Sequence, residues 1–259
     1  MDVNDAAVTL DGRVAIVTGA GQGVGQGIAN RLAQLGAHVV IAARRAATGE
    51  PAAEAIRATG GSAECIVTDV TSRESIAACV EATVAGHGRL DAMVHNAFAG
   101  GDASRLEETP ADAWFQMSRT AVWASFWCAQ LAHPHLRASD QGRLVLVTSP
   151  SGVEGSANIP LYSPAKAAQR AIAKSLAREW GPEGITVNCI APVAETPALA
   201  GIFVQVPTLR GSIEARTPIG RIGDPTDDIG GVVAFLVGRD AGYVTGQTIV
   251  CDGGSFLGL

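Results

Sequence analysis

The chain has 259 residues, of which 47% are hydrophobic and 17% charged, and its formal net charge is −6. That apolar fraction is enough for a large buried core, which excludes general disorder. An acidic balance without a cluster of Lys and Arg argues against nucleic acid as a partner. The five cysteines are scattered singly, so we expect reduced thiols in a cytoplasmic protein.

Residues 1–11 carry three Asp and no Lys or Arg. A secretory signal needs a basic region followed by apolar residues, so we expect only an N-terminal tail here. The longest apolar stretch, 121–132, is shorter than the roughly 20 residues that span a membrane. We therefore expect no membrane partner.

Seven short apolar runs recur along the chain between longer segments. Near-continuous apolarity is typical of strands covered on both faces. Between the first two runs, Val24, Ile28 and Leu32 recur every four residues, as on one face of a helix. This alternation predicts an α/β fold, a doubly wound, Rossmann-like parallel sheet of about seven strands with helices on both faces. The runs are 14–17, 39–42, 64–67, 91–94, 144–147, 186–190 and 248–251.

No linker or internal repeat divides the sequence, so we expect one domain over residues 1–259. Residues 193–217 contain no strand run. An excursion late in such a fold suits a lid over a substrate, and an ordinary surface connection is an equally good interpretation.

Glycines gather in the turn after the first predicted strand, where residues 18–25 read TGAGQGVG. Glycine lets the backbone approach a pyrophosphate, and the following helix N-terminus offers free N–H groups and a positive dipole end. The position predicts a dinucleotide site, with a tight turn that binds nothing as the alternative. The expected contacts are Gly19, Gln22, Gly23, Val24 and Gly25.

The end of the second predicted strand should lie beside the adenosine ribose. Residues 42–45 have no acid there, whereas a carboxylate would bind the ribose hydroxyls and repel a 2′-phosphate. Guanidinium groups suit a phosphate, so Arg44 and Arg45 favour NADP over NAD, unless both are merely solvated. After the third strand, Asp69 beside Val70 is placed to accept from the adenine amino group or to cap the next helix.

Tyr162 and Lys166 stand four residues apart, on one face of a predicted helix. Pro164 fits only a first turn, so this helix should begin at about residues 161–163. Ser149 follows the fifth strand and should lie at the same sheet edge. The pKa of a phenol, about 10, is too high for proton transfer near neutrality, and a nearby ammonium should lower it. The set predicts an acid/base, a charge that tunes it and a hydroxyl that holds the reacting oxygen.

In combination these motifs resemble the short-chain dehydrogenase/reductase family over about residues 12–254. The family patterns T-G-x-x-x-G-x-G and Y-x-x-x-K stand at 18–25 and 162–166, and residues 251–254 are similar to its V-D-G-G. The resemblance implies hydride transfer between a nicotinamide and a carbinol or ketone carbon. It implies Tyr162 as general acid/base, Lys166 as its partner that also holds the nicotinamide ribose, and Ser149 bound to the substrate carbonyl.

The same resemblance places Asn96 and Ala97 on the adenosine side, and Val193 and Thr196 at the carboxamide. The sequence also departs from the family. Phe98 replaces a glycine and should narrow the substrate mouth or give it an aromatic wall, and Val193 replaces another glycine.

The largest departure is Ala121, which stands where the family has a catalytic Asn. In the family that Asn holds a water that links the lysine to solvent. Thr120, Ser118 or a backbone carbonyl with water are the available stand-ins. If this relay limits the rate, restoring Asn at position 121 should raise turnover.

His133 and His135 lack further ligands nearby in the sequence, so we expect a surface pair and no metal site. We expect His95 to be a hydrogen-bonded structural imidazole.

Four aromatic residues lie on a helix expected over about 111–136, as on a buried face: Trp114, Trp123, Phe126 and Trp127. The equivalent helix of the resembled family packs between subunits, which implies a homo-oligomer, a dimer or tetramer.

The leading hypothesis is an NADP(H)-dependent oxidoreductase for a secondary alcohol or ketone, possible kin of 3-oxoacyl-acyl-carrier-protein reductases. The alternative is a nucleotide-binding regulatory or scaffold protein of the same fold. A pocket of Phe98, 151–154 and 194–204 should take a mostly apolar small molecule, with Glu154 or Glu195 for a polar group.

Overall fold

The strands form a single parallel sheet. The computed structural model describes residues 9–99, 105–157 and 159–257, so most of the tail expected at 1–11 lies outside it. Within the described residues, seven parallel strands lie in the order β3-β2-β1-β4-β5-β6-β7, and each falls on one predicted run. The predicted fold class is therefore confirmed. The strands are β1 (Val14–Thr18), β2 (His38–Ala43), β3 (Ser62–Val67), β4 (Ala92–His95), β5 (Arg143–Val147), β6 (Thr186–Pro192) and β7 (Thr248–Cys251).

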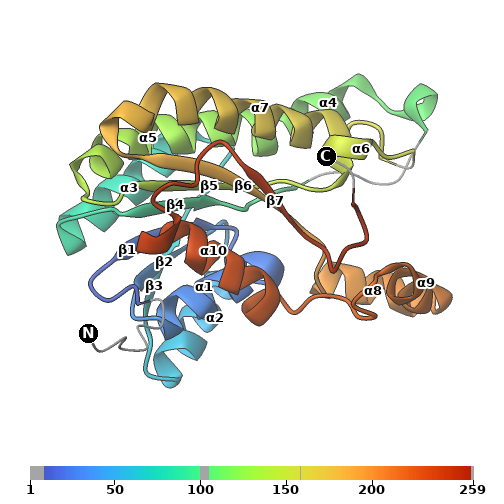
Figure 1. Cartoon of the computed structure of the whole chain (residues 1–259), viewed down its shortest axis with the longest axis horizontal. Helices are drawn as coiled ribbons and strands as arrows, with labels where there is room; N and C mark the ends of the chain where they lie inside the picture. The colour runs from blue at the N-terminus through green and yellow to red at the C-terminus, as the bar shows by residue number, and fades with distance from the viewer. Residues whose placement is uncertain (1–8, 100–104, 158, 258–259) are drawn as a thin grey trace.

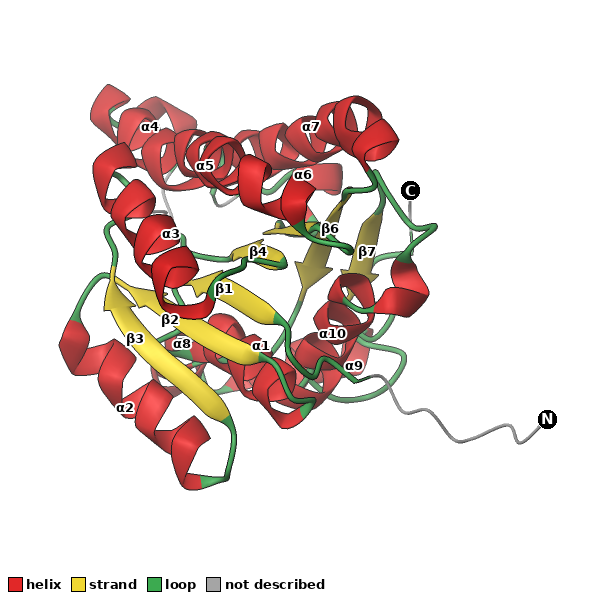
Figure 2. Cartoon of the chain, turned by 90° about the vertical axis from the view of Figure 1, so that its left-hand side faces the viewer, coloured by secondary structure: helices red, strands yellow, loops and turns green. Residues whose placement is uncertain are grey.

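Helices cover both faces of the sheet (Figures 1 and 2). One face carries α1 (Gly23–Gln34), α2 (Ala46–Ala58) and α10 (Gly231–Val237), and the other carries α3 (Arg73–His87), α5 (Ala124–Ala138) and α7 (Tyr162–Trp180). Each layer packs on its own apolar core, with Ile28 and Val233 buried in one and Cys128 and Ala173 in the other. The described residues also form α4 (Ala111–Ser118), α6 (Ser151–Glu154), α8 (Pro197–Gln205), α9 (Thr208–Arg216), η1 (Leu106–Glu108), η2 (Arg119–Trp123), η3 (Gly181–Glu183), η4 (Pro225–Gly230) and η5 (Arg239–Ala241).

The helix expected over 111–136 forms with one wide turn inside it. The segment η2 is π-helical and joins α4 to α5 without a break in direction. Such wide turns are rare and often mark functional sites, because they free backbone groups from the regular ladder. The expectation of a buried aromatic face is wrong for Trp114, Trp123 and Phe126, which are 36%, 52% and 46% exposed.

The excursion between β6 and β7 is helical rather than irregular. The hydroxyl of Thr196 accepts a hydrogen bond from the Leu199 backbone N–H at 3.2 Å and so caps α8, with Pro197 in its first turn. No residue of α8 is buried, and Ile213 alone is buried in α9. Two helices with so little buried surface are weakly anchored to the body of the domain.

No helix in the described part of the chain combines the length and apolarity needed to cross a bilayer.

Candidate active site

A cleft of about 600 Å³ lies at the carboxyl ends of the strands. In doubly wound sheets ligands bind at this edge, where the strand order reverses beside β1. The predicted residues that line the cleft are Gly19, Gln22, Gly23, Val24, Arg44, Arg45, Asp69, Val70, Asn96, Ala97, Tyr162, Lys166, Val193 and Thr196. Two further predicted residues, Gly25 and Ser149, are buried next to lining residues and do not form its surface.

The glycines let the turn pack closely against neighbouring backbone. Gly19 has a φ of +68°, and a Cβ there would lie 2.7 Å from the Cα of Ala97. A Cβ on Gly25 would lie 2.6 Å from the carbonyl oxygen of Gly19. The side chain of Gln22, at the N-cap of α1, makes no capping hydrogen bond. The first N–H groups of α1 are therefore free of a side-chain cap, and this arrangement fits a diphosphate.

Asn96 fixes the loop after β4 against the glycine turn. Its side-chain amide donates to the carbonyl oxygen of Thr18 at 3.0 Å. In return, the hydroxyl of Thr18 accepts from the backbone N–H groups of Asn96 and Ala97 at 3.1 and 3.0 Å. The Asn96 amide thus holds this part of the cleft wall against the end of β1.

His95 is a buried structural imidazole, as expected from the sequence. Its Nε2 lies 3.2 Å from the carbonyl oxygen of Thr120 and its Nδ1 lies 3.0 Å from the hydroxyl of Thr18. Because a carbonyl only accepts, Nε2 carries the proton and Nδ1 accepts from Thr18. Burial, and then the charge of Lys166, lower the pKa of His95 to about 3, so the ring is neutral.

Arg44 and Arg45 follow β2 and are exposed where they line the cleft. Asp69, which follows β3, lines the same part of the cleft. Asp69 Oδ1 accepts from the N–H and hydroxyl of Thr71 at 2.9 and 2.8 Å. Burial would raise the pKa of Asp69, but these bonds and the charges of Arg44 and Arg119 outweigh it and lower the pKa. The alternative role of Asp69 as a helix cap is wrong, because Ser72 caps α3.

Ser149 and Tyr162 lie side by side where β5 ends and α7 begins. Burial raises the pKa of Tyr162, and the neighbouring Ser149 hydroxyl acts in the opposite direction. The ring of Phe98 meets that of Tyr162 edge to face, with 5.1 Å between centroids. Phe98 thus forms an aromatic wall of the cleft, one of the two consequences expected from it.

Lys166 is buried beneath these rings, with 3% of its surface exposed. Its Nζ donates to the carbonyl oxygen of Val147 at 2.8 Å and to Oε1 of Gln169 at 3.0 Å. It lies 4.8 Å from the Phe98 centroid and 5.7 Å from that of Tyr162. Burial lowers the pKa of Lys166 to about 7.

The expected lowering of the Tyr162 pKa by Lys166 is therefore wrong for this structure. The net shift of the phenol pKa is upward, and burial is its largest cause. The ammonium donates to Val147 and Gln169 and lies 5.7 Å from the centroid of the phenol ring. Burial penalises the phenolate more than the other groups stabilise it.

A hydrogen-bonded series of buried side chains lies beside Ala121, the position where the family has an Asn. Gln169 Nε2 donates to the hydroxyl of Ser125 at 2.9 Å, which donates to the carbonyl oxygen of Ala121 at 2.6 Å. That carbonyl lies in the π-helical turn η2. Of the stand-ins expected, neither Thr120 nor Ser118 has a hydrogen bond to Lys166 among the described residues. The sequence signal that could have found Gln169 is its position three residues after the lysine, on the same helix face.

His133 forms a surface pair with a carboxylate, as its place near a helix end suggested. Its Nε2 lies 2.7 Å from Oε2 of Glu183, and its ring packs against Trp180 at 4.6 Å between centroids.

Comparison with known proteins gives the class of the molecule. The model of a family described as enoyl-(acyl carrier protein) reductase matches residues 19–255. A cis-4-hydroxycyclohexanecarboxylate dehydrogenase of Sinomonas cyclohexanicum is 37% identical over 93% of this chain and 96% of its own length. A tropinone reductase homologue of Arabidopsis thaliana is 36% identical over 95% of this chain and 91% of its own.

A solved structure from Beutenbergia cavernae is similar in fold and sequence. It is provisionally described as an NAD(P)-dependent gluconate 5-dehydrogenase with NADP bound at low occupancy. The TM-score is 0.87 and the identity 33%, over 95% of this chain and 98% of the other. The chain belongs to the short-chain dehydrogenase/reductase family. It is an NAD(P)-dependent oxidoreductase of that family.

Proposed function

We propose that this enzyme interconverts a ketone and a secondary alcohol with NADP(H), using Tyr162, Ser149 and Lys166. One observation carries the proposal. The phenol of Tyr162 and the buried ammonium of Lys166 line one part of a cleft, with the Ser149 hydroxyl beside the phenol, and a glycine turn at the start of α1 lines another part. An acid/base, an oxygen-binding group and a cofactor cradle in one cavity are the parts that carbonyl reduction requires.

In ketone reduction the bound nicotinamide supplies the hydride to the carbonyl carbon. The hydroxyl of Ser149 holds the carbonyl oxygen, and Tyr162 gives that oxygen its phenolic proton. The raised pKa of Tyr162 keeps the phenol protonated at rest, as an acid must be. The ammonium of Lys166, 5.7 Å from the centre of the phenol ring, offsets only part of the burial cost of the phenolate that forms, and alcohol oxidation reverses these movements.

Gln169 is a positioning residue in this scheme. The described residues give partners to two of the three N–H groups of Lys166, namely Val147 and Gln169. The third N–H is available for a ribose hydroxyl. The series of hydrogen bonds from Gln169 through Ser125 ends at the buried carbonyl oxygen of Ala121. It therefore holds the Lys166 ammonium in place and gives protons no path to solvent.

For the cofactor, Arg44 and Arg45 support NADP. Both are exposed on the cleft where the 2′ position of a bound adenosine would lie, and no carboxylate follows β2. Asp69 stands across from them, but its Oδ1 is occupied by Thr71. Guanidinium groups bind phosphate through charge-assisted, bidentate bonds, which gives NADP the advantage over NAD.

We infer a mostly apolar substrate of modest size. Phe98, which contacts Tyr162, lines the cleft together with Ala198 and Leu199. Residues 151–154 and 202–204, which the sequence placed in the pocket, do not line it. Glu195 pairs with Arg210 and is not free for a polar substrate group. The two relatives compared above suggest a cyclic alcohol or ketone, in preference to a 3-oxoacyl chain.

We also propose that residues 193–217 close over the substrate. The start of α8 lines the cleft, while the rest of α8 and α9 has little buried surface to hold it open or shut. A segment of that kind moves at low cost.

The outer face of the helix formed by η2 and α5 supports a homo-oligomer. Trp123 and Phe126 are exposed there and contact each other edge to face, with 6.3 Å between centroids. Exposed aromatic residues side by side are typical of subunit interfaces. Sedimentation of the wild type beside Phe126→Glu tests this proposal, and a wild-type monomer contradicts it.

The reaction is tested by following NADPH absorbance with a panel of cyclic and open-chain ketones. Cofactor binding is measured separately by NADPH fluorescence. Turnover of at least one ketone supports the proposal. Tight NADPH binding without turnover on any ketone or secondary alcohol supports the scaffold alternative instead.

A further inference from the structure

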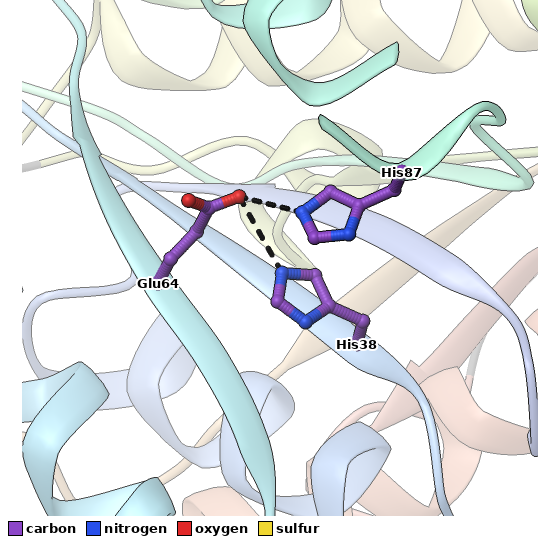
Figure 3. A group of neighbouring side chains, drawn as sticks. All are labelled: His38, Glu64 and His87. Atoms are coloured by element: carbon purple, nitrogen blue, oxygen red, sulfur yellow. Dashed lines mark hydrogen bonds and ion pairs between the residues drawn. The ribbon is translucent and has the colours of Figure 1, made fainter. Parts of the chain in front are cut away.

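Three ligand-type side chains meet at the sheet edge opposite the cleft. His38 begins β2, Glu64 lies in β3, and His87 ends α3 (Figure 3). Ala43, at the other end of β2, lines the cleft, and the five residue-to-residue steps from His38 to Ala43 span ~16 Å. The cluster therefore has no part in the reaction proposed above.

One carboxylate oxygen faces both imidazole rings. Oε1 of Glu64 lies 2.8 Å from Nε2 of His87 and 3.5 Å from Nε2 of His38. Each residue offers one ligand atom, and these atoms all lie within 4.8 Å of one another. Donors around a tetrahedral zinc ion lie about 3.3 Å apart, as bond lengths of about 2.0–2.2 Å require. Small side-chain movements are enough to bring the three atoms to that spacing.

The environment of His38 is an independent sign of a poorly satisfied ring nitrogen. Its Nε2 is buried and makes no hydrogen bond, and only the long 3.5 Å contact joins it to Oε1 of Glu64. A buried nitrogen without a hydrogen bond is costly and uncommon. On the other side of the ring, Nδ1 lies 2.7 Å from the hydroxyl of Ser62. When Nδ1 donates to Ser62, Nε2 presents its lone pair toward Glu64, as in histidines that bind metals.

The close spacing of the His38 and His87 rings also favours neutral imidazoles, the form of histidine that binds metal ions. Their centroids lie 3.9 Å apart, too close for two imidazolium charges. Burial, and next the neighbouring His87, lower the pKa of His38.

We propose that His38, Glu64 and His87 bind one divalent transition-metal ion of the zinc class. Two imidazoles and one carboxylate suit Zn²⁺, Co²⁺ or Ni²⁺, whereas Mg²⁺ and Ca²⁺ prefer all-oxygen sites. Three protein ligands leave a position for water. The ion links β2, β3 and α3, so its role is to stabilise this part of the domain, whatever the substrate of the enzyme.

The test is titration calorimetry of the tag-free, metal-stripped protein with ZnCl₂, with MgCl₂ for comparison. We expect one zinc ion per chain, no response to magnesium, and a higher melting temperature with zinc. Glu64→Gln and His87→Gln should each weaken zinc binding at least about tenfold, and Ser62→Ala by about 10–100-fold. Glu64 is 42% exposed, so its isosteric variant tests the site without disturbing the core.

His133→Gln is the matched control, because His133 and Glu183 form a histidine–carboxylate pair without a second imidazole. It should bind zinc as the wild type does. Absence of zinc binding by the wild type, or unchanged binding by both Glu64→Gln and His87→Gln, overturns the proposal. A thiolate-to-metal charge-transfer band with Co²⁺ also overturns it, because the ion would then lie on a cysteine.

Discussion

The ammonium of Lys166 donates a hydrogen bond to the side-chain carbonyl of Gln169, one turn further along α7, over 3.0 Å. Both side chains are buried, at 3% and 1% exposure. Among the described residues no carboxylate forms an ion pair with Lys166, so a neutral amide and the Val147 carbonyl compensate for its lost hydration. A buried charge held only by dipoles is easily discharged, as the lowered pKa of Lys166 shows.

Gln169→Leu removes that amide, and we expect kcat/KM for ketone reduction to fall about tenfold or more, with weaker NADPH binding because Lys166 would also hold the ribose. A lost bond to a buried charge costs about 1.5–3 kcal/mol. Gln169→Glu places a carboxylate beside Lys166 and raises its pKa from about 7. Because activity requires the charged lysine, the decline of kcat/KM on the basic side should move to higher pH. Rates measured from pH 5 to 10 give both results.

The control for these variants is Gln130→Leu, since Gln130 lies on the surface and its side chain hydrogen-bonds only Arg73 within the described part of the chain. If Gln169→Glu keeps the wild-type pH profile while folding normally, Gln169 does not position the lysine.

Arg44→Ala should weaken NADPH binding about tenfold or more, because a bond to a phosphate charge is worth about 1.5–3 kcal/mol. NADH has no 2′-phosphate, so its affinity should change little. Arg45→Ala, made in parallel, shows which guanidinium carries the preference. Fluorescence titration with both cofactors measures the four affinities, and an equal loss for NADPH and NADH in both variants would exclude 2′-phosphate recognition.

His95 should make the protein less stable in acid. Its folded pKa, about 3, lies below the unfolded value of 6.5, so the unfolded chain binds the extra proton between these values. The free energy of unfolding therefore falls as pH drops below about 6.5, by up to about 1.4 kcal/mol per pH unit. Urea unfolding at several pH values should show a shallower fall for His95→Asn than for the wild type. His135→Asn, at a helix surface, should keep the wild-type slope, and equal slopes for all three proteins would remove His95 as the cause.

The sheet could be predicted from the sequence because a strand covered on both faces is apolar along its whole length. Runs such as 144–147 have that pattern, and they become β5 and its neighbours. The start of α7 was equally predictable, because Pro164 fits only a first turn. The glycine turn and the Tyr162–Lys166 pair lie within single local segments, where spacing decides geometry.

The rest depends on packing between distant segments. Gln169 reaches Ser125 only because α7 crosses η2 and α5, and no local pattern records that crossing. His38 and Glu64 come together through the β2–β3 register, in which His38 pairs with Ser62. The direction of the Tyr162 pKa shift depends on how deeply the phenol is buried, which a spacing of four residues does not reveal.

The central claim is that Tyr162 transfers the proton, and Tyr162→Phe tests it most directly. The variant loses one hydroxyl and keeps the ring against Phe98. Stopped-flow oxidation of pre-bound NADPH by an accepted ketone should slow by about 10²–10⁴-fold, while the Kd for NADPH stays within about twofold. A variant that binds NADPH normally and reduces the ketone at the wild-type rate would contradict the account.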